Sequence, residues 1–125
     1  MFKSFTFVRM RPGLSRDEFF RRWCAHTQTW DLRDHPEIRL HRLVLVEGEG
    51  PYVGIAENHW DDRAALERAA AWYATPQGQA HWADLAGFMD VDGSPTVVVT
   101  HEARVSAAHG VEVLASPGPG RAGDA

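Results

Sequence analysis

Hydrophobic periodicity changes several times along the chain, and the order of these changes constrains the fold more than any other feature. Strand-like patterns with two distinct faces occur in 2–10, 38–46 and 52–60, and a fourth strand is predicted over 96–105 because Val97-Val98-Val99 has a high strand propensity. Apolar residues spaced by three or four positions, as on one face of a helix, occur in 16–30, 62–73 and 77–88. The predicted order is therefore strand, helix, strand, strand, two helices and strand.

This order is the split βαβ arrangement of a ferredoxin-like α+β fold, in which helices cover one face of a four-stranded antiparallel sheet. The first strand presents Phe5 and Phe7 on one face and Val8 and Met10 on the other. Both faces of the sheet are therefore expected to be covered. Because the helices cover only one of them, we expect a second copy to pack on the other as a two-fold symmetric homodimer.

The chain has 125 residues, enough for one domain, which we expect to span 1–105. The remaining segment, 106–125, has six Gly or Pro residues among twenty and is predicted to be a mostly disordered tail. Its exception is a short strand-like segment at 111–114, whose partner would be a sheet edge of its own chain or of a second copy.

Charge and composition exclude several classes of function. Thirteen Lys and Arg against seventeen Asp and Glu give a net charge of −4, which argues against nucleic-acid binding. No run approaches the roughly 18 apolar residues of a membrane span, and the charged N-terminus is unlike a secretory signal. The single cysteine, Cys24, excludes a disulfide framework and a Cys-rich zinc site. We therefore expect a cytoplasmic protein.

Short motifs follow one another in a characteristic order along residues 2–105. The first group is Pro12-Gly13-Leu14-Ser15, Glu18-Phe19, Trp23 and His26. The second group is Gly54-Ile55-Ala56-Glu57 and Trp60-Asp61-Asp62. The third group is Thr75-Pro76-Gln77-Gly78, Asp84, Phe88, Asp90 and Glu102. Together they resemble the EthD family of dimeric α/β barrels.

The resemblance implies a cavity between the sheet and its helices that holds a small hydrophobic or aromatic molecule. Related barrels include methylmuconolactone isomerases, polyketide cyclases, cofactor-free anthrone oxygenases and haem-degrading monooxygenases, so the fold alone does not choose a reaction. His59 stands where the resemblance predicts an aromatic residue before Trp60, and this departure indicates a pocket that differs from those of the relatives.

His26 is the leading candidate for catalysis. Its spacing from Trp23 and Trp30 places it on the apolar face of the first helix. Histidine gives and takes protons near neutral pH, so His26 is expected to act as a general base or acid. The competing interpretation is a structural histidine held by one backbone hydrogen bond. The resemblance favours the catalytic role.

Three further histidines, His41, His59 and His101, fall on predicted strands, where alternation decides which face of the sheet each one occupies. His59 shares a strand face with Glu57, which would orient its ring, and it is the second catalytic candidate. The third is Tyr73, whose hydroxyl would donate a proton to a developing oxyanion. The alternative for Tyr73 is a core aromatic residue with its hydroxyl at the surface.

Seven residues are predicted to bind the substrate: Phe19, Trp23, His41, Arg42, Trp60, Asp84 and Phe88. Arg42 would hold a carboxylate with two parallel hydrogen bonds, or would form a salt bridge between subunits. No role is expected for His35, His81 or His109. The sequence contains no HxH, HExxH or paired-cysteine motif, so we expect neither a metal nor a cofactor.

Three functions remain open. The first is a small cofactor-independent enzyme that acts on an aromatic or polyketide-like molecule by proton transfer, in a cyclisation, dehydration, decarboxylation or isomerisation. The second is a monooxygenase that uses O2 directly or through haem. The third is a barrel that binds an aromatic ligand without turning it over, because binding pockets and proton-transfer pockets share a composition.

Overall fold

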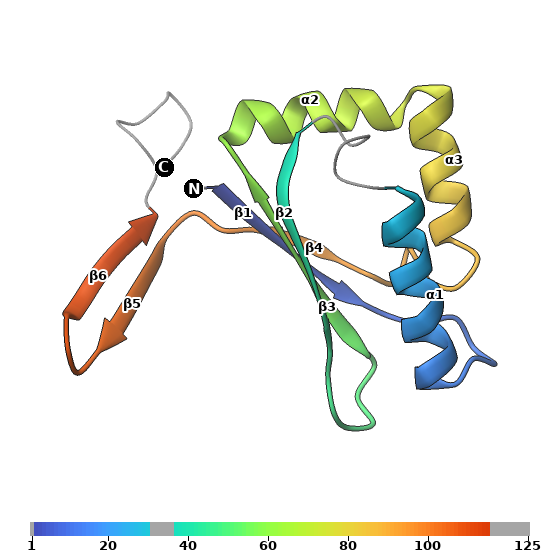
Figure 1. The fold of residues 1–125 in the computed structure, drawn as a ribbon, viewed down its shortest axis with the longest axis horizontal. Coiled ribbons are helices and arrows are strands. Elements are labelled where there is room, and N and C mark those ends of the chain that lie inside the picture. The colour runs from blue at the N-terminus through green and yellow to red at the C-terminus, as the bar shows by residue number, and fades with distance from the viewer. Residues whose placement is uncertain (1, 31–36, 116–125) are drawn as a thin grey trace.

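The computed structural model describes residues 2–30 and 37–115 (Figure 1). The helices are α1 (Arg16–Thr29), α2 (Arg63–Tyr73) and α3 (Pro76–Leu85). The strands are β1 (Phe2–Val8), β2 (Ile38–Leu45), β3 (Gly54–Trp60), β4 (Thr96–Val98), β5 (Glu102–Ser106) and β6 (Gly110–Ala115). The predicted α+β class and the order of its first six elements are confirmed.

The main sheet has four strands in the order β2-β3-β1-β4, and every neighbouring pair is antiparallel. The three helices gather on one side of this sheet (Figure 1). This is the predicted ferredoxin-like arrangement, in which β1 and β3 lie at the centre. We call the sheet surface away from the helices the open face.

Polar side chains at the first turn of each helix determine where the helices begin. The Ser15 hydroxyl accepts a hydrogen bond from the Glu18 N–H at 3.1 Å, as the spacing of these two residues predicts. Asp62 accepts from the Ala65 N–H at 2.8 Å at the start of α2. These caps satisfy N–H groups that have no partner inside the helix.

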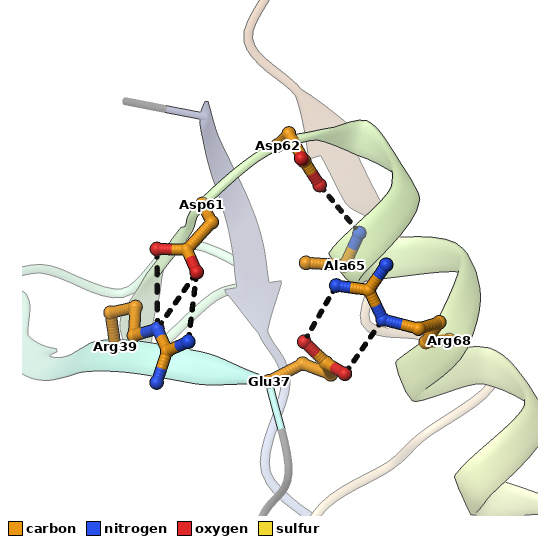
Figure 2. A network of polar contacts seen from close by, with 6 residues as sticks. All are labelled: Glu37, Arg39, Asp61, Asp62, Ala65 and Arg68. Atoms are coloured by element: carbon orange, nitrogen blue, oxygen red, sulfur yellow. Dashed lines mark hydrogen bonds and ion pairs between the residues drawn. The ribbon is translucent and has the colours of Figure 1, made fainter.

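Ion pairs tie the start of β2 to the end of β3 and to α2 (Figure 2). Arg68 on α2 binds Glu37 at 2.8 Å, and Arg39 on β2 binds Asp61 at 2.8 Å. The guanidinium of Arg68 lowers the pKa of Glu37, and that of Arg39 lowers the pKa of Asp61. Both pairs fix the entry of the chain into β2, the strand that carries His41.

The core lies between the helices and the sheet in two clusters. The larger one comprises Val8, Phe19, Trp23, Val53, Ala56, Leu85, Phe88 and Met89. The smaller one comprises Ile38, Trp60, Ala65 and Ala69. Trp60 is only 3 % exposed, and its indole N–H donates to the buried Ser4 hydroxyl at 3.1 Å.

Helices α2 and α3 meet at a corner that admits only a glycine. A Cβ atom on Gly78 would lie 2.4 Å from both the Trp72 carbonyl oxygen and the Tyr73 Cα. The Thr75 hydroxyl accepts from the Gly78 N–H at 3.2 Å, and Pro76 occupies the first turn of α3. The first turn of α3 therefore packs directly on the last turn of α2.

The prediction of one strand over 96–105 is wrong. The chain pairs with β1 only through β4 and Val99, whose N–H donates to the Lys3 carbonyl at 2.9 Å. It then leaves the sheet, and β5 pairs with β6 instead. Gly110, with φ of 62°, allows the tight turn between them. The valines on either side of the break all favour a strand, so strand propensity does not reveal it.

The β5–β6 hairpin stands away from the body of the molecule (Figure 1). One of its faces carries Val105, Val111 and Val113, which are 68–73 % exposed. Arg104 and Glu112 form an ion pair at 2.9 Å on the other face. Strand β6 includes the segment 111–114, while the expected disorder of 116–125 lies outside the described residues.

Candidate functional site

A cavity of about 140 Å³ opens between the three helices and the sheet face that they cover. Its aromatic wall consists of Trp23, Trp30, Tyr73 and Trp82. Two polar groups of side chains face each other across it, His26 with His81 on the helices and His41 with Asn58 on the sheet. A cavity with apolar walls and a few polar groups is the usual form of a small-molecule site.

His26 lies in a linear array of hydrogen bonds on the helix side. It is 6 % exposed, and its Nδ1 lies 2.6 Å from Asp84 Oδ2. Its Nε2 lies 3.2 Å from Nε2 of His81. Because the Asp84 carboxylate only accepts hydrogen bonds, Nδ1 of His26 carries the proton and donates it. Nε2 is then the proton-accepting atom, and it faces His81.

Aromatic rings hold the two imidazoles in place. Phe88 packs edge-on against His26 with ring centroids 5.8 Å apart. Trp30 and Tyr73 pack against His81 at 5.5 and 5.4 Å. Such contacts fix ring orientation and keep water away from the imidazoles. The array is therefore a positioned acid–base group at the edge of an aromatic cavity.

The sheet side of the cavity carries a second polar pair. His41 and Asn58 are direct partners across β2 and β3, and Nδ1 of His41 donates to Asn58 Oδ1. Burial lowers the pKa of His41, and the hydrogen bond to Asn58 only partly opposes this. His41 is therefore neutral at pH 7, and its Nε2 is a hydrogen-bond acceptor.

Tyr73 lines the cavity at the end of α2, and burial raises its pKa to about 12. The phenol therefore remains protonated and can donate a hydrogen bond over the whole physiological range. This property fits the predicted role of Tyr73 as a proton donor to a developing oxyanion.

This pKa shift predicts an alkaline loss of stability. Below pH 10 the phenol is neutral in both states, but between pH 10 and about 12 it ionises only in the unfolded chain. The free energy of unfolding should fall there by about 1.4 kcal/mol per pH unit from this one group. Urea unfolding of wild type and Tyr73→Phe across this range measures the difference. Parallel pH dependences in the two proteins would contradict the assigned burial of the hydroxyl.

The structure places His59 and Arg42 on the open face. His59 does pair with Glu57, at 2.5 Å, and this hydrogen bond lowers the pKa of Glu57. Ala56 and Asn58 of the same strand line the cavity, so alternation directs His59 to the opposite side of the sheet. The sheet therefore separates His59, the second catalytic candidate, from His26, and Arg42 is not positioned to hold a ligand in the cavity.

The other predicted binding residues divide between the cavity and the core. Trp23 and His41 line the cavity. Asp84 and Phe88 contact His26 instead of facing the cavity. Phe19 and Trp60 are buried in the two core clusters. Phe19 and Trp60 therefore support the residues of the cavity wall without lining the cavity themselves.

His81, for which no role was expected, is the residue that sequence reasoning missed. It precedes Leu85 by four positions, so both lie on the inward face of α3. This four-residue spacing from Leu85 is the sequence signal that could have placed His81 beside the cavity. His101, in the linker between β4 and β5, and His109, in the turn of the hairpin, are exposed and do not line the cavity, and His35 lies outside the described residues.

Over residues 2–30 and 37–115, no group of three or more His, Cys, Asp or Glu side chains is arranged to hold a metal ion. Within the same part of the chain, no helix is long and apolar enough to cross a membrane.

Comparison with solved structures identifies proteins of the same fold. An antibiotic biosynthesis monooxygenase superimposes with a TM-score of 0.53 and 19 % identity, over 79 % of this chain and 96 % of its own. SnoaB, a cofactor-independent oxygenase from Streptomyces nogalater, gives 0.51 and 21 %, over 85 % and 93 %. The shared fold is ferredoxin-like.

A third structure, a dimeric protein of unknown function and ferredoxin-like fold from Bacteroides fragilis NCTC 9343, has a TM-score of 0.53 and 13 % identity. It covers 78 % of this chain and 91 % of its own. No protein-family model and no curated protein matches the sequence. At these identities the likeness establishes the architecture, and the chemistry has to be argued from the side chains.

Proposed function

We propose that this protein is a small cofactor-independent enzyme of the EthD type that acts on an aromatic or polyketide-like substrate by proton transfer. The observation that carries the proposal is the Asp84–His26–His81 array at the edge of an aromatic cavity. An imidazole with a carboxylate on one nitrogen and a proton-accepting lone pair on the other is a common arrangement for a general base.

The roles of the residues follow from their hydrogen bonds. Asp84 holds the proton of His26 on Nδ1 and stabilises the imidazolium that forms when Nε2 accepts a second proton. His81, at 3.2 Å from Nε2, passes that proton between His26 and the cavity. Tyr73 donates a hydrogen bond to the oxygen on which negative charge develops. The proton returns to another atom of the same substrate, which makes the reaction an isomerisation, a cyclisation or, with loss of water, a dehydration.

A second candidate is a cofactor-independent monooxygenase, and the names of two proteins with the same fold favour it. The same base would deprotonate a phenol or enol. The electron-rich ring would then be oxidised by O2, with one oxygen atom entering the product and the other leaving as water. In a haem-dependent variant an imidazole of the cavity would have to hold the iron; those of His26 and His81 already bind other groups, so His41, whose Nδ1 alone is bound to Asn58, would be the residue to hold it.

Turnover with and without oxygen separates the candidates. The protein is incubated with hydroxylated naphthalenes and anthrones under air and under argon. The molecular masses of the products are then determined by mass spectrometry. Proton transfer predicts products of equal mass, or of that mass less water, at the same rate under both gases. Dependence on O2 with incorporation of oxygen supports the monooxygenase instead. Tight binding without any product contradicts both enzymes and leaves the ligand-binding function.

We propose in addition that two copies associate through their open faces. Leu40, Val44, Tyr52 and Val97 on this face are 36–45 % exposed, and Phe5 and Phe7 lie between them. Large apolar side chains gathered on one exposed face favour association with a second copy that covers them. The dimeric state named for the Bacteroides fragilis protein of the same fold supports this association.

A further inference from the structure

We infer that the cavity selects uncharged oxygenated rings, such as phenols, quinones and aryl ketones, and rejects carboxylates and phosphate-bearing molecules. The inference rests on the proposed function only in that the cavity is taken as the substrate site. It restricts the predicted substrates to uncharged molecules, on the basis of the charges of the residues around that site.

The first observation is the absence of permanent charge on the wall. Among the described residues that line the cavity there is no Lys, Arg, Asp or Glu. Three arginines of α1 and β2 are engaged elsewhere. Arg22 lies over the ring of Phe88, Arg16 donates to the Val46 carbonyl, and Arg42 lies on the open face.

The second observation concerns the charge of three titratable groups of the wall, His26, His41 and Tyr73. His41 stays neutral at pH 7, because burial lowers its pKa, and Tyr73 stays protonated, because burial raises its pKa to about 12. Any positive charge on His26 is balanced by the carboxylate of Asp84 at 2.6 Å. These three groups therefore offer no unbalanced cation to an anionic ligand.

A carboxylate that enters such a cavity loses its hydration and gains no ion pair, which is strongly unfavourable. A hydroxyl or carbonyl oxygen has matched partners there instead. His41 Nε2 accepts, the Tyr73 hydroxyl donates, and the Thr6 and Thr96 hydroxyls, 2.8 Å apart, do either.

This selectivity has a consequence for the reaction. Decarboxylation of a free acid requires a bound carboxylate. Of the four predicted proton-transfer reactions, it is therefore the one that this cavity favours least. Cyclisation, dehydration and isomerisation act on neutral ketones and phenols, and so does the oxygenation of a phenol. The preferred substrates of the wild-type protein are therefore neutral.

Three naphthalenes of the same ring system test the inference by isothermal titration calorimetry at neutral pH. They are beta-naphthol, beta-naphthamide and beta-naphthoate, and the last two differ mainly in charge. We expect the naphthol and the naphthamide to bind, and the naphthoate to bind about a hundredfold more weakly, which corresponds to about 2.7 kcal/mol. Equal binding of naphthamide and naphthoate would overturn the inference, and so would no binding of any of the three.

A gain-of-function variant adds an independent measurement. Thr96 is an exposed residue at the rim of the cavity, so Thr96→Arg introduces a cation without burying it. We expect it to strengthen naphthoate binding about tenfold, a change typical of one added charge pair in a partly dry site. Thr100→Arg, which adds the same charge to an exposed residue outside the cavity, is the matched control. Equal gains in both variants would contradict the inference.

These binding measurements do not depend on turnover. Loss of selectivity between naphthamide and naphthoate would refute the neutral cavity even in an active enzyme. Conversely, a selective protein without any turnover would refute the proposed proton transfer and leave the neutral cavity intact.

Discussion

Replacing His26 by Gln is expected to lower the turnover number by about 10²–10⁴-fold on any substrate that the wild-type protein converts by proton transfer. Glutamine keeps much of the size of the side chain and can still hydrogen-bond Asp84, but it cannot accept a proton at neutral pH. The effect should lie in kcat, with a smaller change in KM, because the ring wall that binds the substrate is unchanged. Steady-state kinetics measures both.

His101→Gln is the matched control for this prediction. His101 is exposed in the linker between β4 and β5, where its ring bonds the Thr100 hydroxyl at 3.0 Å. The same substitution there should leave kcat within about twofold of wild type. A folded His26→Gln protein, verified by circular dichroism, that retains full activity would remove His26 from the mechanism.

The double substitution Val105→Asp and Val113→Asp is expected to convert the proposed dimer into a monomer. These valines are 73 % and 72 % exposed on the apolar face of the hairpin. A two-stranded hairpin that stands alone in water is marginally stable, so this face is expected to pack on the second copy. Carboxylates at both positions would be buried there without partners, at a cost of several kcal/mol. Light scattering measures the mass directly.

His109→Asp is the control for added charge, because His109 lies in the exposed turn of the same hairpin. It should leave the mass unchanged. A wild-type protein that is monomeric at high concentration would contradict the association, and a dimeric Val105→Asp, Val113→Asp protein would remove the hairpin from the interface.

Most of the fold could be predicted from the sequence because its signals are local. Ser15 and Glu18 indicate the first turn of α1, and the helix begins at Arg16 as expected. Alternation in β3 correctly separates His59 from Asn58, because neighbouring residues of a strand point to opposite faces. The end of the main sheet was not predictable. Whether a valine-rich segment continues along one neighbour or turns to another depends on contacts distant in sequence.

The site was predicted in part for the same reason. His26 was found because α1 carries a clear apolar face, on which Trp23 and His26 are buried. His81 was missed because α3 is short and begins at a proline, so its face is poorly defined by spacing alone. The partnership of His26 with Asp84 and His81 joins residues that are 58 and 55 positions apart. Only the packing of α1 on α3 brings them together.

The geometry of the cavity depends on Gly78, which lies at the corner between α2 and α3 and has no side chain. Tyr73 ends α2 and His81 lies in the first turns of α3, so the angle of this corner sets the separation of the proposed proton donor from the proposed proton carrier. A methyl group there would push the two helices apart at their junction and tilt both side chains at once. Substitutions in the walls can change the chemistry of this pocket. Position 78, at the junction of the two helices that carry Tyr73 and His81, admits no larger residue than glycine.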